Sequence, residues 1–150
     1  MTGSKSFLRE LDDAVLRGTA ESRARALWHT TDLMITGRYS EDEIWTFGEV
    51  IGRLADEIEV AARAQLAKRL AKFDRAPVNI IHKLAFDDSI EVAGPILRDS
   101  VQLEPYALVA NVCTKDQSHM LAITQRETLE ESVTDELVTR GNHEDRKSVV

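Results

Sequence analysis

Residues 40–58, SEDEIWTFGEVIGRLADEI, hold the clearest structural signal in this chain. Ser40 and Glu43 have the S-x-x-E spacing of a capping box, in which each side chain accepts a hydrogen bond from the other residue's amide. The sequence therefore predicts a helix that begins near Glu41. We favour a break near Asp56, because one helix reaching Phe73 would be about 48 Å long, too long for a compact domain of this size. The apolar face has the i, i+3, i+4, i+7 spacing of a helix: Ile44, Phe47, Gly48, Ile51, Leu54, Ala55 and Ile58.

Helical periodicity also dominates on both sides of this stretch. Upstream, apolar stripes predict a first helix from Phe7 to Val15, ended by Gly18, and a second between Thr19 and Gly37. Downstream, short helices are expected at 56–73, 77–86, 89–100, 105–112, 117–124 and 129–140, with another from about 143 after a helix end at Gly141. Pro95 should kink its helix. No strand-like alternation competes with this pattern.

An internal repeat links the two halves of the chain. DEIEVA at 56–61 matches DSIEVA at 88–93 with an offset of 32 residues, and the D-x-x-E spacing could cap a helix start in both copies. A weaker third copy, TLEESV at 128–133, also has the spacing of a capping box. Repeats of this length made of helix pairs are typical of an α-solenoid.

The repeated segments also resemble a known family. APVNIIHKLAFDD at 76–88, EVAGPILRDS at 91–100 and the 129–141 segment are similar to an uncharacterised bacterial family of unknown function with HEAT-like helical repeats, as is RAQLAKRLA at 63–71. The resemblance covers roughly residues 40–150. Together with the helical periodicity, it predicts an all-α fold in which an N-terminal helical bundle runs into a short HEAT-like α-solenoid, a right-handed superhelix of antiparallel helix pairs. It implies no catalytic residues.

Length and composition fit one globular unit. The chain has 150 residues, of which 43% are hydrophobic and 30% charged, a balance that argues against disorder. We expect a single all-helical domain over 1–150, with N-terminal helices at 1–55 and HEAT-like repeats at 56–150. The apolar end at Val149 and Val150 predicts an open C-terminal edge.

The charge is acidic and unevenly distributed. Nineteen Lys and Arg against 26 Asp and Glu give a net charge of -7, which disfavours nucleic acid as the main ligand. Residues 1–75 hold 12 basic and 13 acidic residues, whereas 76–150 hold 7 and 13. Any anion-binding surface should therefore lie in the first half. No export signal or membrane span is evident, so the expected location is cytoplasmic and no membrane partner is expected.

Signals for chemistry are weak throughout. The only cysteine, Cys113, excludes an intrachain disulfide and a cysteine-based zinc site, and the four histidines lack metal-ligand spacing. There is no Gly-rich phosphate loop, no G-x-S-x-G and no H-E-x-x-H. We therefore expect no enzyme activity, no cofactor and no catalytic or metal-binding residues.

Two features could bind a partner. Trp45 lies one residue off the apolar stripe, so it could be partly exposed and anchor another protein, although packing against a neighbouring helix is the commoner outcome. Arg63, Lys68, Arg69, Lys72 and Arg75 form the one basic run. The leading hypothesis is a non-enzymatic scaffold that binds an unidentified protein or a second copy of itself. The alternative is a nucleic-acid-binding HEAT-like domain, as in HEAT-like DNA glycosylases, that uses the basic face at 63–75.

Overall fold

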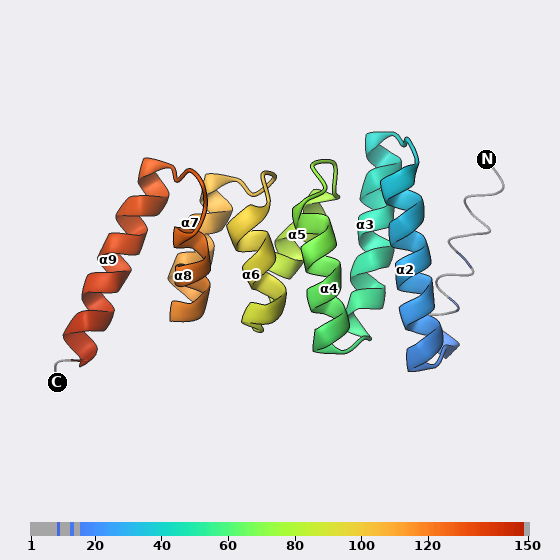
Figure 1. The fold of residues 1–150 in the computed structure, drawn as a ribbon, viewed down its shortest axis with the longest axis horizontal. Coiled ribbons are helices and arrows are strands. Elements are labelled where there is room, and N and C mark those ends of the chain that lie inside the picture. Colours follow the sequence, from blue (N-terminus) through green and yellow to red (C-terminus); the bar gives the residue numbers. More distant parts are fainter. Residues whose placement is uncertain (1–8, 10–12, 14–15, 149–150) are drawn as a thin grey trace.

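The structure is a computed structural model, which describes residues 9, 13 and 16–148. Over these residues the fold is all-helical and contains no strand (Figure 1). The predicted helix at 7–15 and the apolar end at 149–150 lie outside the described residues, apart from Arg9 and Asp13. The helices are α2 (Ala20–Thr36), α3 (Glu41–Asp56), α4 (Val60–Ala71), α5 (Val78–Ala85), α6 (Ile90–Asp99), α7 (Pro105–Thr114), α8 (Gln117–Thr124) and α9 (Glu131–Ser148).

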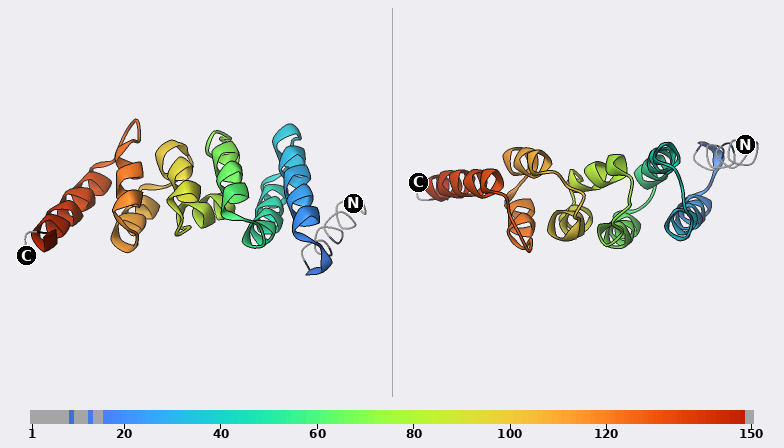
Figure 2. Two further views of the ribbon diagram at one scale, coloured as in Figure 1. Left: turned by 60° about the horizontal axis from the view of Figure 1, so that its bottom comes forward. Right: turned by 90° about the horizontal axis from the view of Figure 1, so that it is seen from above.

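The helices stand side by side in an elongated row, with α2 and α9 at opposite ends (Figure 1). Several helices pack against the helix two places further along: α3 packs on α5, α4 on α6, α6 on α8 and α7 on α9. Seen from above, the row is two layers deep, with α2, α4, α6 and α8 in one layer and α3, α5 and α7 in the other (Figure 2). The helices α3, α5, α7 and α9 all begin along the upper edge in Figure 1.

Side-chain caps explain where the first two described helices begin. Thr19 Oγ1 accepts a hydrogen bond from the amide of Ser22 and starts α2. Ser40 and Glu43 form the complete capping box of α3, as the sequence predicted. The predicted break near Asp56 is also confirmed, because α3 ends at that residue and α4 begins at Val60.

One predicted helix boundary and one predicted capping motif are wrong. Gly141 does not end a helix, since α9 runs without interruption from Glu131 to Ser148. A glycine that ends a helix commonly adopts a positive φ angle, and no described glycine does so. The D-x-x-E pairs do not cap helices either. The N-cap residues of α4 and α6 are Glu59 and Ser89, and neither side chain makes a capping hydrogen bond.

The two aspartates of the repeat have another role. Asp56 Oδ2 accepts a hydrogen bond from Lys83 Nζ at 2.8 Å, and Asp88 Oδ1 accepts one from Lys115 Nζ. Both pairs join residues 27 positions apart in the sequence. Since Asp88 follows Asp56 by 32 residues and Lys115 follows Lys83 by 32, the sequence repeat is also a repeat of one cross-helix ion pair.

Apolar side chains fill the space between the two layers. The largest side chains that are almost fully buried come from six of the helices: Leu27, Met34, Ile51, Leu54, Leu66, Leu70, Ile80, Ile81, Leu84, Ile96, Leu97 and Ile123. Pro95 lies buried inside α6, which continues through it. Trp28 is half-buried against this core, and the Arg69 guanidinium lies 5.6 Å from the centre of its ring. The core thus leaves the outer face of each layer available for other contacts.

Candidate partner-binding surface

A cleft of about 380 Å³ lies at the upper edge, between the start of α3 and the loop that leads into α5. Trp45 is 53% exposed there, so its indole contributes an apolar surface to solvent rather than to the core. The sequence offered this exposure as one of two outcomes. The cleft is lined by Tyr39, Glu41, Ile44, Trp45, Arg75, Ala76, Pro77, Val78 and Gln102.

The wall formed by α3 is held tightly against α5. Gly48 makes this approach possible, because a Cβ atom added to it would lie 2.0 Å from Asn79 Oδ1 and 2.6 Å from Pro77 Cβ. Asn79 Nδ2 donates a hydrogen bond to the Trp45 carbonyl at 3.3 Å, one turn before this contact. The indole Nε1 donates to Glu49 Oε1 at 2.8 Å, which fixes the ring on the helix surface. Trp45 is therefore presented in a defined orientation.

The remaining walls are fixed by side chains that bond to backbone atoms. Gln102 bridges two loops, since its Oε1 accepts from the Ala76 amide at 3.0 Å and its Nε2 donates to the Ala76 carbonyl at 2.5 Å. Tyr39 donates its hydroxyl to the Leu33 carbonyl at 3.0 Å, and its ring meets Phe47 edge-on at 4.7 Å. The cleft is thus preorganised on three sides, which lowers the entropy cost of binding a ligand.

Exposed apolar side chains continue from the cleft onto α7. Val101 precedes Gln102 in the chain, and the Gln102 side chain bonds to Ala76 in the loop before α5. Tyr106 contacts His82 with ring centroids 6.0 Å apart, and His82 lies one helical turn beyond Val78 on α5. These contacts join α3, α5 and α7 into one surface, which we call the apolar band. Its four members and their exposed fractions are Trp45 (53%), Val78 (45%), Val101 (75%) and Tyr106 (66%).

The basic run predicted from the sequence is divided among several contacts. Arg63 Nε donates to Asp87 Oδ2 at 3.1 Å and its Nη1 donates to the Ile58 carbonyl at 2.9 Å. Arg69, in contrast, forms an ion pair with Asp32 of α2. At about 100° per residue, Arg63 and Arg69 point in directions about 120° apart around α4. Two of the five basic residues therefore link α4 to neighbouring segments.

The other three basic residues are exposed. Lys68 and Lys72 lie one turn apart on or just beyond α4, and Arg75 follows in the next loop. Of these, only Arg75 lines the Trp45 cleft. The structure thus brings Trp45 together with Arg75, and it does not bring Trp45 together with Arg63, Lys68, Arg69 or Lys72 within that cleft.

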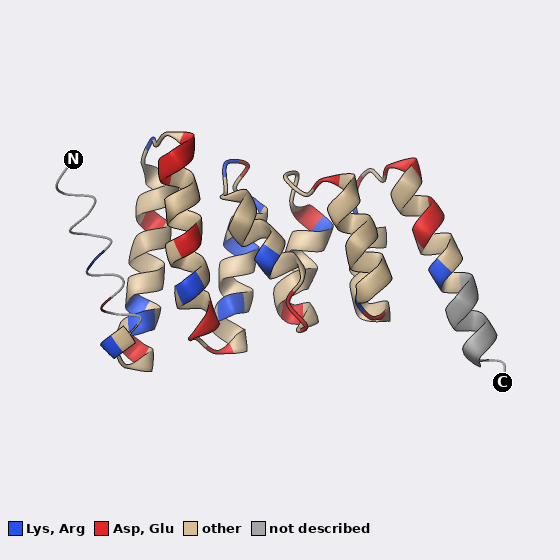
Figure 3. Ribbon diagram, turned by 180° about the vertical axis from the view of Figure 1, so that it is seen from behind, with Lys and Arg blue, Asp and Glu red and all other residues tan. Residues whose placement is uncertain are grey.

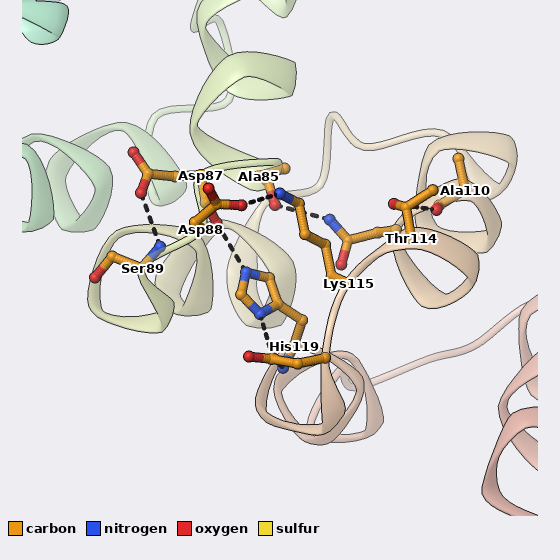
Figure 4. A network of polar contacts seen from close by, with 10 residues as sticks. Ala85, Asp87, Asp88, Ser89, Ala110, Thr114, Lys115 and His119 are labelled. Carbon is orange, nitrogen blue, oxygen red and sulfur yellow. Dashed lines mark hydrogen bonds and ion pairs between the residues drawn. The ribbon is translucent and has the colours of Figure 1, made fainter. Parts of the chain in front are cut away.

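A separate polar cluster lies at the opposite edge, where α6 and α8 begin (Figure 4). His119 is 1% exposed, with Nδ1 2.8 Å from Asp116 Oδ1 and Nε2 2.8 Å from the Asp87 carbonyl oxygen. Both ring nitrogens therefore lie within hydrogen-bond distance of an oxygen atom. Asp116 also accepts from the His119 amide as the N-cap of α8, and these hydrogen bonds hold the pKa of Asp116 below its ordinary value of 3.8.

Nearby residues complete this cluster. Asn111 Nδ2 donates to the Ala85 carbonyl at 2.8 Å and satisfies the end of α5. The ammonium of Lys115 lowers the pKa of Asp88. Because each charged group in the cluster has a partner, we interpret it as a connection between neighbouring helices rather than as a reactive site. Elsewhere, the Cys113 thiol donates to Glu136 Oε1 at 3.1 Å, and this hydrogen bond raises the pKa of Cys113.

In the part of the chain that the structure describes, no group of three or more His, Cys, Asp or Glu residues is placed to hold a metal ion. None of the helices there is long and apolar enough to cross a membrane.

Sequence reasoning missed most of the apolar band. Val78, Val101 and Tyr106 carried no sequence signal of exposure, because the apolar residues of short helices are normally assigned to the core. Their proximity depends on contacts between residues far apart in the sequence, such as Gln102 with Ala76 and Tyr106 with His82. A usable signal would have been the position of each residue within its helix, because Val78 is the first residue of α5 and Tyr106 the second of α7.

Comparison with known proteins supports part of the resemblance seen in the sequence. The sequence model of the family DUF2336, described as an uncharacterised protein conserved in bacteria, matches residues 92–150. This region includes α7, α8, α9 and most of α6, and it contributes Val101 and Tyr106 to the apolar band. No curated protein and no solved structure matches the chain.

Proposed function

We propose that this chain is a non-enzymatic scaffold that binds another protein through the apolar band. The observation that carries the proposal is Trp45, a large aromatic side chain that is 53% exposed yet held in a fixed orientation beside a cleft. Tryptophan and tyrosine are enriched among the residues that dominate protein interfaces. Trp45 and Tyr106 are the two aromatic members of the band.

The arrangement of the helices supports an α-solenoid of the HEAT-like kind. Layers that pack every second helix together, and an ion pair that recurs after 32 residues, are features of stacked helix pairs. We propose that the repeats occupy residues 56–150, that the N-terminal helices occupy 1–55, and that the superhelix is right-handed. Extended surfaces across several helices are what such folds use to bind partners. Fold alone does not establish that use, so the proposal depends on the band.

The alternative function, nucleic-acid binding through the basic face at 63–75, has less support. Arg63 and Arg69 are engaged in ion pairs, and the net charge of -7 repels phosphates. Lys68, Lys72 and Arg75 remain exposed and could contact an anion. Nuclease treatment separates the two functions in one experiment.

The test compares two variants that remove equally exposed apolar side chains. Trp45→Ala truncates the band, and Leu121→Ala truncates a side chain that is 52% exposed on α8 in the other layer. Each variant is used, beside the unchanged protein, to capture partners from a bacterial lysate with and without nuclease. Circular dichroism checks that both variants fold.

The proposal expects a discrete protein that Leu121→Ala retains after nuclease treatment and Trp45→Ala loses. Loss of an interface hot spot costs about 2 kcal/mol or more, which corresponds to a roughly 30-fold weaker Kd. Equal retention by both variants would remove Trp45 from the function. Capture that disappears with nuclease would favour the basic face, and capture of the chain itself would identify the partner as a second copy.

A further inference from the structure

The apolar band is bordered by acidic residues. The segments that form the band and its border, 37–49, 74–78 and 101–106, contain six acidic residues and two basic ones, a net charge of -4. The acidic residues are Glu41, Asp42, Glu43, Glu49, Asp74 and Glu104, and the basic ones are Arg38 and Arg75. Acidic positions at the start of α3 lie along the same upper edge as those that begin α7 and α9 (Figure 3).

Helix capping accounts for only part of this charge. Glu43 accepts from the Ser40 amide in the capping box, and Glu49 accepts from the Trp45 indole. Glu104 is the N-cap residue of α7, but its side chain makes no capping hydrogen bond. Glu41 and Asp42 are exposed in the first turn of α3, where they complement the positive end of the helix dipole. With six acidic residues against two basic ones in these segments, a ligand on the band meets a negative field.

The shape of the surface limits what can occupy it. The cleft between Trp45 and Val78 has room for one apolar anchor of a ligand. Tyr106 and Val101 add further exposed apolar surface toward α7. A ligand that spans this band must therefore carry an apolar anchor and several further residues. Charge complementarity favours Lys or Arg in those flanking residues, because like charges across an interface are penalised.

We propose that the partner of this scaffold presents a segment with one aromatic or aliphatic anchor flanked by Lys and Arg. The anchor enters the cleft beside Trp45, and the basic residues face Glu41, Asp42 and Glu104. This inference rests on the proposed docking function, since it names the partner for that same surface. A membrane surface and an acidic peptide are both disfavoured by the negative border.

A random dodecapeptide library displayed on phage supplies the probe. The library is selected on the full chain and then sorted for peptides that bind the Leu121→Ala variant but not Trp45→Ala. We expect the sorted peptides to hold more Lys and Arg than Asp and Glu, around a shared apolar position. Their Kd should rise about tenfold between 0.05 and 0.5 M NaCl, because screening weakens exposed charge pairs.

Two charge variants test the border directly. Neutralising Glu41 and Glu104 together, as E41Q with E104Q, should weaken the sorted peptides about three- to tenfold. The matched control, E59Q with E91Q, removes two exposed carboxylates near the starts of α4 and α6, on the opposite edge, and should leave their Kd unchanged.

The outcomes separate this inference from the function on which it rests. Trp45-dependent peptides that are neutral or acidic, or whose Kd ignores salt, would overturn the basic partner and leave the docking function standing. Absence of any Trp45-dependent peptide would overturn both. If E41Q with E104Q and E59Q with E91Q raised the Kd equally, the peptides would respond to the overall negative charge of the chain rather than to the carboxylates beside the band.

Discussion

The contact between α3 and α5 at Gly48 can be tested by adding a single methyl group. Gly48→Ala places a Cβ atom 2.0 Å from Asn79 Oδ1 and 2.6 Å from Pro77 Cβ, so α5 must move or Asn79 must release the Trp45 carbonyl. Gly52→Ala adds the same methyl one turn later, where the nearest atoms are Lys83 Cδ at 3.5 Å and Ile80 Cδ1 at 3.8 Å. The two substitutions therefore differ in space and not in chemistry.

The expected changes in the free energy of unfolding have opposite signs. Replacing glycine by alanine inside a helix stabilises it by about 0.5–1 kcal/mol, and this gain applies at both positions. At Gly48 the overlap costs about 1–3 kcal/mol, and loss of the Asn79 hydrogen bond costs about 1 kcal/mol more. We expect Gly52→Ala to be stabilising and Gly48→Ala to be destabilised relative to it by roughly 2–4 kcal/mol.

Urea titration followed by circular dichroism at 222 nm measures this difference. For a chain of this size the corresponding gap in Tm is roughly 5–15 °C. Trp45 fluorescence should also shift in Gly48→Ala and stay constant in Gly52→Ala, because only the first substitution disturbs the Asn79 contact. Equal stability of the two variants would refute the close approach of α3 and α5, and with it the fixed orientation of Trp45.

Two further predictions concern side-chain contacts between helices. Arg126 donates from its two terminal nitrogens to the carbonyls of Leu97 and Ser100, each at 2.7 Å. Arg126→Met should therefore lower the free energy of unfolding, measured by urea titration, by about 2–4 kcal/mol. A decrease below about 0.5 kcal/mol would contradict this role of Arg126. Asp116 has a folded pKa below its ordinary value of 3.8, so the stability it contributes is present above pH 3.8 and lost as pH falls through the folded pKa. Asp116→Asn keeps an oxygen that can cap α8 but does not titrate. Thermal unfolding of this variant between about pH 5 and 2.5 should therefore show a smaller loss of stability than the unchanged chain shows. Parallel pH profiles of the two proteins would exclude Asp116 as a source of acid sensitivity.

The sequence predicts local features of this fold well and cross-helix features poorly. Thr19, Ser40 and Glu43 act on amides within three residues, so their spacing alone was sufficient to place two helix starts. The roles of Asp56 and Asp88 could not be inferred in the same way, because each carboxylate meets a lysine 27 residues further along. The D-x-x-E spacing suggested a cap, but in the fold each aspartate forms an ion pair with one of these lysines instead.

The candidate surface likewise contains one residue that the sequence predicts and others that depend on packing between helices. Trp45 was singled out because its position relative to one helical stripe can be counted in the sequence. Tyr106 and Val78 could not be assigned to the same surface, since their proximity depends on how α5 and α7 pack. Gly141 shows the opposite error, where a residue with a strong local preference was overruled and α9 continued through it.

The recurring links between neighbouring helices also bear on how the chain folds. The side-chain links between helices described above join residues only 23 to 37 positions apart, from Cys113 with Glu136 to Asp32 with Arg69. Chains whose contacts are this local fold quickly, on the microsecond to millisecond scale, because little loop entropy is lost before each contact forms. The early helices can therefore assemble on the ribosome while the last ones are still being synthesised, so folding can keep pace with translation.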